Sequence, residues 1–138
     1  MRSLWGWGDV ESRADLQETQ ARIEPFFGES AVEEAAAPRV PKARVEVPRE
    51  LAEFSSADDT TRASRAMGKS YVDRVRGFRG DFSSAPDFVT FPRTEAELVR
   101  LLEIAEAQLL ALTPGGGGSS VVAGCEPLLG PSHRCALT

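Results

Sequence analysis

A run of four glycines, Gly115 to Gly118, constrains this 138-residue chain more than any other feature. The run lies within LTPGGGGSSVVAG, residues 112–124, between two apolar segments. Glycine adopts positive φ without steric penalty and lets a backbone approach a ligand closely. A flexible linker is usually bordered by polar, low-complexity residues, but here an apolar run enters the glycines and SSVVAG follows them. Three interpretations stay open: a phosphate-binding loop, a tandem-glycine linker, or a structural turn.

The phosphate interpretation rests on the donors that such a loop offers. Successive backbone N–H groups can surround an anion, and Ser119 and Ser120 would add hydroxyl donors. Two well-known patterns are absent, because no Gly-Lys-Ser/Thr follows the glycines and no G-x-G-x-x-G opens a long helix. A phosphate or pyrophosphate site here would therefore be neither a Walker loop nor a Rossmann turn.

The residues before the glycines predict a strand, a helix and a second strand. DFVTF, residues 87–91, is β-branched and aromatic, which favours a strand. Thr94 and Glu97 then form a capping box. An apolar stripe recurs at helical spacing and is expected to face the sheet: Leu98, Leu101, Leu102 and Ala105. LLALT, residues 109–113, reads as the second strand, and a right-handed crossover would make the two strands parallel neighbours.

The first half of the chain predicts helical and extended segments. Residues 11–24 favour an amphipathic helix that Pro25 would end, and residues 28–50 read as an extended linker. A short helix ending at Gly68 follows, with Asp58 as its cap, and one helical turn is expected within residues 69–86. Trp5 and Trp7 are expected to pack onto another part of the protein.

Composition narrows the function classes. The net charge of −5 and the pI near 5.0 argue against nucleic-acid binding through bulk charge. No stretch approaches the length of a transmembrane helix, and the start of the chain lacks a signal-peptide core. We therefore expect a cytoplasmic protein in which Cys125 and Cys135 are free thiols. The single histidine, His133, gives neither a catalytic triad nor a zinc site.

Residues 85–124 resemble the start of the FAD-binding domain of the vanillyl-alcohol oxidase/p-cresol methylhydroxylase (PCMH) type. Pro86, Asp87 and Pro92 match its opening pattern PD-x-V-x-x-P, and the glycine loop matches P-x-G-G-G-[ST]-S. The resemblance implies FAD as the cofactor, with its pyrophosphate held by the loop. The implied cofactor-binding residues are Pro114, Gly115, Gly116, Gly117, Gly118, Ser119 and Ser120.

The upstream segments sharpen this resemblance. SLWGWGD and MGKSYVDRVRGFRGDFSSAPD are similar to bacterial FAD-linked oxidases of the alkyldihydroxyacetonephosphate synthase branch. The matching residues are Gly68, Lys69, Ser70, Tyr71 and Asp73. The branch implies an FAD-dependent oxidase of 2-hydroxy acids or an alkylglycerone-phosphate synthase acting on an acyl-glycerone phosphate. The substrate, the flavin linkage and the oligomeric state stay open.

Three positions depart from the family pattern. Leu109 and Ala123 stand where the family usually has glycine, and Gly115 stands where a bulky residue is usual. At Leu109 the exchange should remove a left-handed helix cap. The resemblance ends near residue 127, and the tail LLGPSHRCALT matches nothing expected, as after a frameshift, a premature stop or a gene-model error.

These observations predict an α+β fold in three parts. Residues 1–84 form a helical and extended region, residues 85–127 the start of an incomplete PCMH-type FAD-binding subdomain, and residues 128–138 an unmatched tail. The chain would be an N-terminal fragment without the substrate domain or any assignable catalytic residue. The alternative is a non-catalytic truncated product or a small interaction protein without flavin. A half-domain would leave Val121, Val122 and the Leu98 stripe exposed and prone to self-association.

Overall fold

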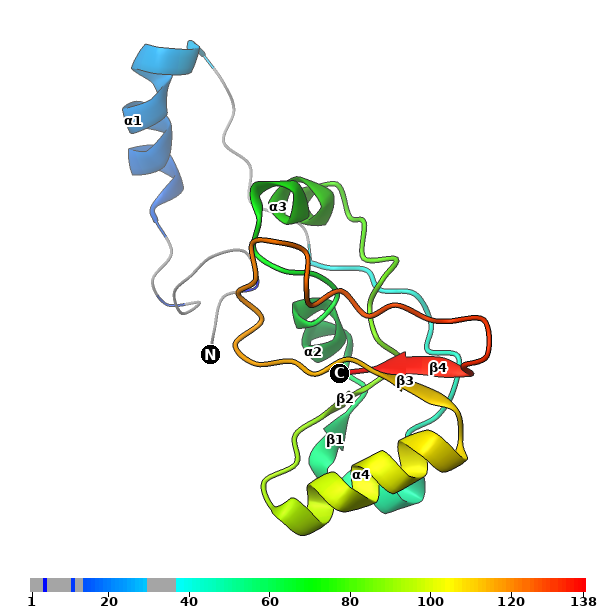
Figure 1. The fold of residues 1–138 in the computed structure, drawn as a ribbon. Helices are drawn as coiled ribbons and strands as arrows, with labels where there is room; N and C mark the ends of the chain where they lie inside the picture. The colour runs from blue at the N-terminus through cyan, green and yellow to red at the C-terminus, as the bar shows by residue number, and fades with distance from the viewer. Residues whose placement is uncertain (1–3, 5–10, 12–13, 30–36) are drawn as a thin grey trace. The chain divides into compact units, whose positions relative to one another are not determined.

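The computed structural model describes residues 4, 11, 14–29 and 37–138 and divides the chain into two units, Met1–Ala37 and Pro38–Thr138. Figure 1 shows the helices and strands of the two units. Trp5 and Trp7, which the sequence predicts to pack, lie outside the described residues.

The first unit contains one helix, α1 (Leu16–Phe27), among its described residues. The Asp15 side chain caps it by accepting a hydrogen bond from the Glu18 N–H at 2.9 Å. The prediction that Pro25 ends this helix is wrong, because the helix continues through it to Phe27. A proline costs one backbone hydrogen bond, and here the chain leaves the helix only at Gly28, whose φ is 73°.

The second unit mixes short helices and short strands, which confirms the coarse expectation of helices with a small sheet. In chain order its elements are η1 (Arg49–Phe54), β1 (Ser55–Ser56), α2 (Asp59–Ser64), α3 (Tyr71–Phe78), β2 (Val89–Thr90), α4 (Glu95–Ala107), β3 (Leu110–Leu112) and β4 (Cys135–Leu137). The Asp58 cap is as predicted, but α2 ends four residues before Gly68. α3 has eight residues rather than one turn, because Ser70 and Asp73 form a capping box at its start.

The strands on either side of α4 are parallel but are not neighbours, which corrects the predicted pairing. β4 pairs in parallel with β3, and a parallel bridge joins Leu137 of β4 to Phe88, directly before β2. β2 pairs on its other side with β1, antiparallel. The Asp87 N–H donates to the Ala136 carbonyl at 2.7 Å, and the Thr113 N–H donates to the Leu137 carbonyl at 2.9 Å. The crossover through α4 therefore skips one strand position, which β4 fills.

β4 is among the most buried segments of the described chain. Cys135 and Leu137 are fully buried, and Ala136 is 2% exposed. The core around them also holds Leu51, Phe54, Phe88, Leu101, Ala105 and Leu110. The last residues of the tail at 128–138 thus belong to the core of the second unit, although the sequence pattern assigned them no role.

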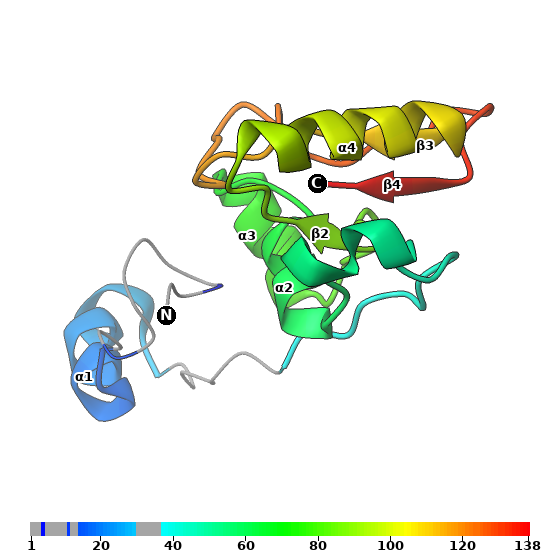
Figure 2. The ribbon, with the colours of Figure 1, turned by 90° about the horizontal axis from the view of Figure 1, so that it is seen from below.

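α4 lies along β3 and β4 in both views (Figures 1 and 2). Its predicted capping box of Thr94 and Glu97 is present. The prediction that the whole apolar stripe faces the sheet is only half right. Leu101 and Ala105 are buried, whereas Leu98 and Leu102 are 44% and 50% exposed. Residues one full turn apart share the narrow contact line with a small sheet, and their neighbours turn away from it.

Two of the positions that depart from the family pattern adopt the backbone conformation that favours glycine. Leu109 has φ 56° and Ala123 has φ 60°. The left-handed turn after α4 is therefore kept, contrary to the expectation that leucine removes it. A residue with a Cβ pays about 1–2 kcal/mol for this conformation. The Leu109 carbonyl accepts a hydrogen bond from the Arg134 N–H at 2.9 Å, which ties the turn to the residue before β4.

Two buried charged residues hold an extended segment, residues 38–47, against the sheet. Asp87 is 1% exposed and accepts from the Arg44 N–H at 2.6 Å, the Arg44 Nε at 3.0 Å and the Ala136 N–H at 2.9 Å. Arg62 is 4% exposed and donates to the carbonyls of Pro86 and Pro41 at 2.8 and 2.7 Å. Each buried charge is thus matched by partners from distant parts of the sequence.

Replacing Asp87 with Asn should lower the free energy of unfolding by roughly 2 kcal/mol, because buried donors lose a charged acceptor. Urea denaturation followed by circular dichroism measures the change. Glu103→Gln is the matched control, since Glu103 is an exposed carboxylate on α4 and exposed charges contribute little. Equal midpoints for both variants would contradict the role assigned to Asp87.

Cys135 should resist alkylation in the folded protein. Burial, with a smaller contribution from the charge of Asp87, raises the pKa of its thiol to about 11, so the reactive thiolate is scarce. Cys125 is partly exposed and serves as the internal control. Iodoacetamide followed by peptide mass spectrometry should modify Cys125 first and Cys135 only in urea. Equal rates without denaturant would show that β4 is not a core strand.

Candidate functional site

The glycine loop joins β3 to the segment that returns to β4, and it is closely packed at two of its glycines. A Cβ added to Gly115 would lie 2.7 Å from Cγ2 of Thr138, so only glycine fits there without a shift. Gly118 has φ 66°, which also favours glycine. Gly116 has open space around its Cα. These constraints describe an ordered loop with an open segment and do not fit a flexible linker.

Arg65, the residue that ends α2, fastens the middle of the loop. Its Nη1 donates a hydrogen bond to the Gly116 carbonyl at 2.6 Å. The same nitrogen would lie 3.6 and 3.5 Å from a Cβ on Gly115 and Gly118. The cavity where the loop meets Arg65, Met67 and Cys125 has a volume of only about 10 Å³, enough for the centre of one water molecule. The guanidinium group therefore lies against three glycines of the loop.

A second anchor holds the end of the loop against the start of α3. The Lys69 N–H donates to the Ser120 carbonyl at 2.7 Å. A Cβ on Gly68 would lie 2.3 Å from that carbonyl oxygen, so the contact requires glycine at this position. The Ser120 Oγ accepts from the N–H groups of Val122 and Gly124 at 3.3 Å. Gly68 and Ser120, which the sequence analysis placed in separate motifs, thus meet in one contact.

An ion-pair network fixes the chain beyond the loop. Arg76 on α3 donates to both carboxylate oxygens of Glu126, at 3.1 and 3.0 Å, and to Asp81 at 2.9 Å. Hydrogen bonding to Arg76 holds the pKa of Glu126 below its usual range. Hydrogen bonds from Ser83 and then Arg76 lower the pKa of Asp81 to about 2. Both carboxylates therefore stay ionised, and the network persists at neutral pH.

Positive charge lies beside the loop. Arg65 contacts it directly, and Lys69 adjoins the Ser120 anchor. Burial, followed by repulsion from Arg74, lowers the pKa of Lys69 to about 8, so this ammonium group remains mostly protonated at pH 7. A nearby anion would favour the charged form of Lys69 further. The surroundings therefore suit a negatively charged ligand.

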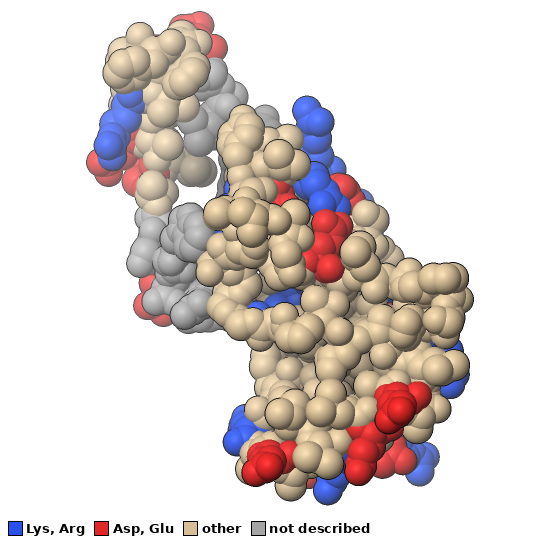
Figure 3. All heavy atoms as spheres, in the orientation of Figure 1, with Lys and Arg blue, Asp and Glu red and all other residues tan. Residues whose placement is uncertain are grey.

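The backbone donors of the loop are available to a ligand. Across the described residues, none of the N–H groups from Gly115 to Ser120 donates a hydrogen bond. Residues 113–125 also carry no charged side chain. Figure 3 agrees with this, because charged side chains gather over α4 at the bottom of the view and the surface over the returning segment is mostly uncharged. The predicted residues Pro114 to Ser120 thus form one anchored, donor-rich loop.

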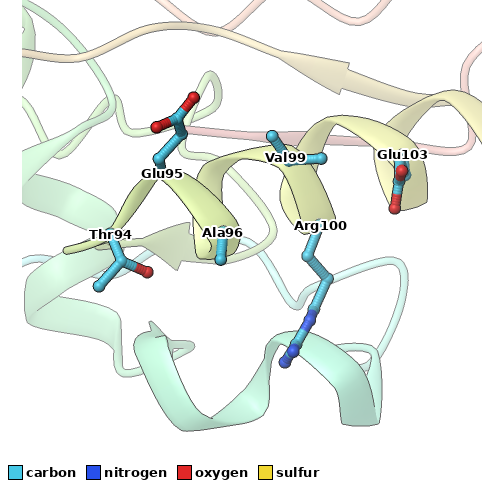
Figure 4. Close-up of a pocket in the computed structure, with 6 residues that line it drawn as sticks. All are labelled: Thr94, Glu95, Ala96, Val99, Arg100 and Glu103. Atoms are coloured by element: carbon cyan, nitrogen blue, oxygen red, sulfur yellow. The ribbon is translucent and has the colours of Figure 1, made fainter.

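A larger hollow elsewhere lacks the features of a site. It measures about 710 Å³ and is lined by residues of α4 and its cap alone (Figure 4): Thr94, Glu95, Ala96, Val99, Arg100 and Glu103. Glu95 and Arg100 point to opposite sides of the helix. No second element brings polar groups to converge there. In the described part of the chain, no three His, Cys, Asp or Glu side chains gather as metal ligands.

The role of Arg65 is not visible in the sequence. Gly68 and Lys69 match a family pattern, but Arg65 matches none, and it lies 51 residues before its partner Gly116. The only sequence clue to this contact is that Arg65 is a long cationic side chain at the end of a short helix. The clue gains meaning only in the folded chain, where α2 lies next to the glycine loop.

Comparison with known proteins shows related sequences of one kind. No family model matches the chain. Alkyldihydroxyacetonephosphate synthase from Dictyostelium discoideum is 33% identical over 93 residues, which cover 64% of this chain and 15% of that protein. The enzyme of the same name from Trypanosoma brucei brucei is 34% identical over 70 residues, or 51% of this chain and 11% of that protein. The chain thus spans a small part of the relatives it matches.

Solved structures agree on the fold. One structure of alkyldihydroxyacetonephosphate synthase has a TM-score of 0.73 and 21% identity, covering 98% of this chain and 31% of its own. A second has a TM-score of 0.71 and 19% identity, with 98% and 32% coverage. None of the helices among the described residues is long and apolar enough to cross a membrane. In sequence and in fold, the chain is similar to part of alkyldihydroxyacetonephosphate synthase.

Proposed function

We propose that this chain is part of an FAD-dependent enzyme of the alkyldihydroxyacetonephosphate synthase type, and that its glycine loop binds the FAD pyrophosphate. One observation carries the proposal: an ordered loop keeps consecutive backbone N–H groups unengaged beside a positive charge. Such an arrangement binds phosphate groups through donors and local positive potential. Similarity to enzymes of that name supports the choice of parent family.

The residues present fit a pyrophosphate group. Gly116 leaves open space above its Cα, so an anion can approach the backbone there. The N–H groups of residues 115–120 would donate to the phosphate oxygens, with the Ser119 hydroxyl as a further donor. Arg65 and Lys69 would offset the negative charge from the other side of the loop. Pro114 would fix the entry of the chain into the cradle through its restricted φ.

When bound, FAD would supply the redox or group-transfer chemistry, and the protein would bind and orient it. The part of the chain described here would contribute the pyrophosphate contacts. The substrate class that we propose is a 2-hydroxy acid or an acyl-glycerone phosphate, as in the family that the sequence resembles. The catalytic residues would lie in parts of such an enzyme that this chain does not span.

The second candidate is a small interaction protein without flavin. Exposed apolar side chains bear on this choice, since Val121 and Val122 are 57% and 83% exposed and Leu98 and Leu102 are half-exposed. A self-contained small domain seldom leaves such side chains open together. Their exposure favours a part of a larger domain, and self-association through them remains a prediction.

The purified chain should bind FAD and inorganic pyrophosphate, and Gly117→Val should weaken both at least about tenfold because a β-branched side chain blocks access to the backbone. Isothermal titration with each ligand measures the affinities. Gly124→Val is the matched control, because a Cβ there would meet only Ser120 Oγ at 3.8 Å. Undiminished binding by Gly117→Val, with an unchanged unfolding midpoint, would disprove the cradle.

A further inference from the structure

The hydrogen bond from Arg65 to the Gly116 carbonyl also fixes the direction of the Gly117 N–H. A peptide unit is planar and trans, so its carbonyl and the following N–H point in opposite directions. The structure has no cis peptide bond among its described residues. Because Arg65 donates to the Gly116 carbonyl at 2.6 Å, the Gly117 N–H points away from Arg65. Gly117 is exposed.

A second peptide, Ser120–Val121, is fixed in the same way at the end of the loop. The Lys69 N–H holds the Ser120 carbonyl, which directs the Val121 N–H away from the start of α3. This second peptide is also limited by the close approach of Gly68. The Gly116–Gly117 peptide has no such steric limit, since a Cβ on Gly116 would meet nothing within 4 Å. Glycine peptides flip readily when nothing holds them, so Arg65 is the group that selects one orientation.

We propose that Arg65 is a positioning residue that orients the Gly116–Gly117 peptide so that the Gly117 N–H faces a bound pyrophosphate group. This inference rests on the proposed function of the loop. Without Arg65, the peptide can turn its carbonyl oxygen toward the ligand, where it would repel the phosphate oxygens. Arg65 therefore acts through the backbone of Gly117, and its cationic head stays on the side of the turn opposite the ligand.

A different role for Arg65 would be direct ion pairing with the anion, and nuclear magnetic resonance separates the two. In the ¹⁵N-labelled full chain, Arg65→Ala should change the shift and the hydrogen-exchange rate of the Gly117 amide before any ligand is added. It should also weaken inorganic pyrophosphate binding about tenfold to a hundredfold, which is the effect of losing a charge-assisted hydrogen bond. Millimolar methylguanidinium should restore part of both signals in this variant.

Arg100→Ala is the matched control, because it removes an arginine from the exposed face of α4. It should leave the Gly117 amide and the affinity for pyrophosphate unchanged. If Arg65→Ala weakens binding but leaves the ligand-free Gly117 amide as in the wild type, Arg65 binds the anion directly and the positioning role is overturned. If the wild-type chain itself fails to bind pyrophosphate or FAD, the proposed function is overturned instead.

Discussion

The carboxylate of Asp87 joins three segments that lie far apart in the sequence, at the place where the strand pair β1–β2 meets the strand pair β3–β4. It accepts hydrogen bonds from Arg44 in the extended segment and from Ala136 in β4, at the point where the chain enters β2. A carboxylate that is 1% exposed is stable only when its oxygens are matched in this way. Arg62 repeats the arrangement with opposite charge, since it binds the carbonyls of Pro41 and Pro86.

The strands and the short helices of the second unit hold the glycine loop in one conformation. β3 and β4 fix the strand that enters the loop and the strand to which the chain returns, and Arg65, Lys69 and Arg76 fasten points between them. The anchors come from short helices that contribute little to the core themselves. The helices α2 and α3 thus serve mainly to bring donors to a loop that has no regular structure of its own. A loop so constrained loses little further entropy when it binds a ligand.

Local chemistry made much of the fold predictable. The capping box of Thr94 and Glu97, the Asp58 cap and the strand before α4 depend on residues close in sequence, and the structure contains them. β4 pairs with β3 across 25 residues, Leu110 with Cys135, and Leu137 bridges to Phe88 across 49 residues. No local pattern encodes these contacts. At Pro25 a local rule failed. Proline was expected to end the helix, but α1 continues for two more residues, to Phe27. The sequence was enough to predict a glycine loop at residues 115–118. It was not enough to predict that Arg65 binds the Gly116 carbonyl, because that contact depends on the fold.

The central place of β4 has a consequence for how this unit assembles. β2, α4 and β3 follow one another closely in the chain, yet the two strands share no ladder until residues 135–137 enter between them. During synthesis β2, α4 and β3 emerge before β4, so the gap between β2 and β3 stays open until residues 135–137 are added. Such non-local closure slows folding. The glycine loop lies between β3 and β4 in the sequence, so it would take its final conformation only after these two strands pair.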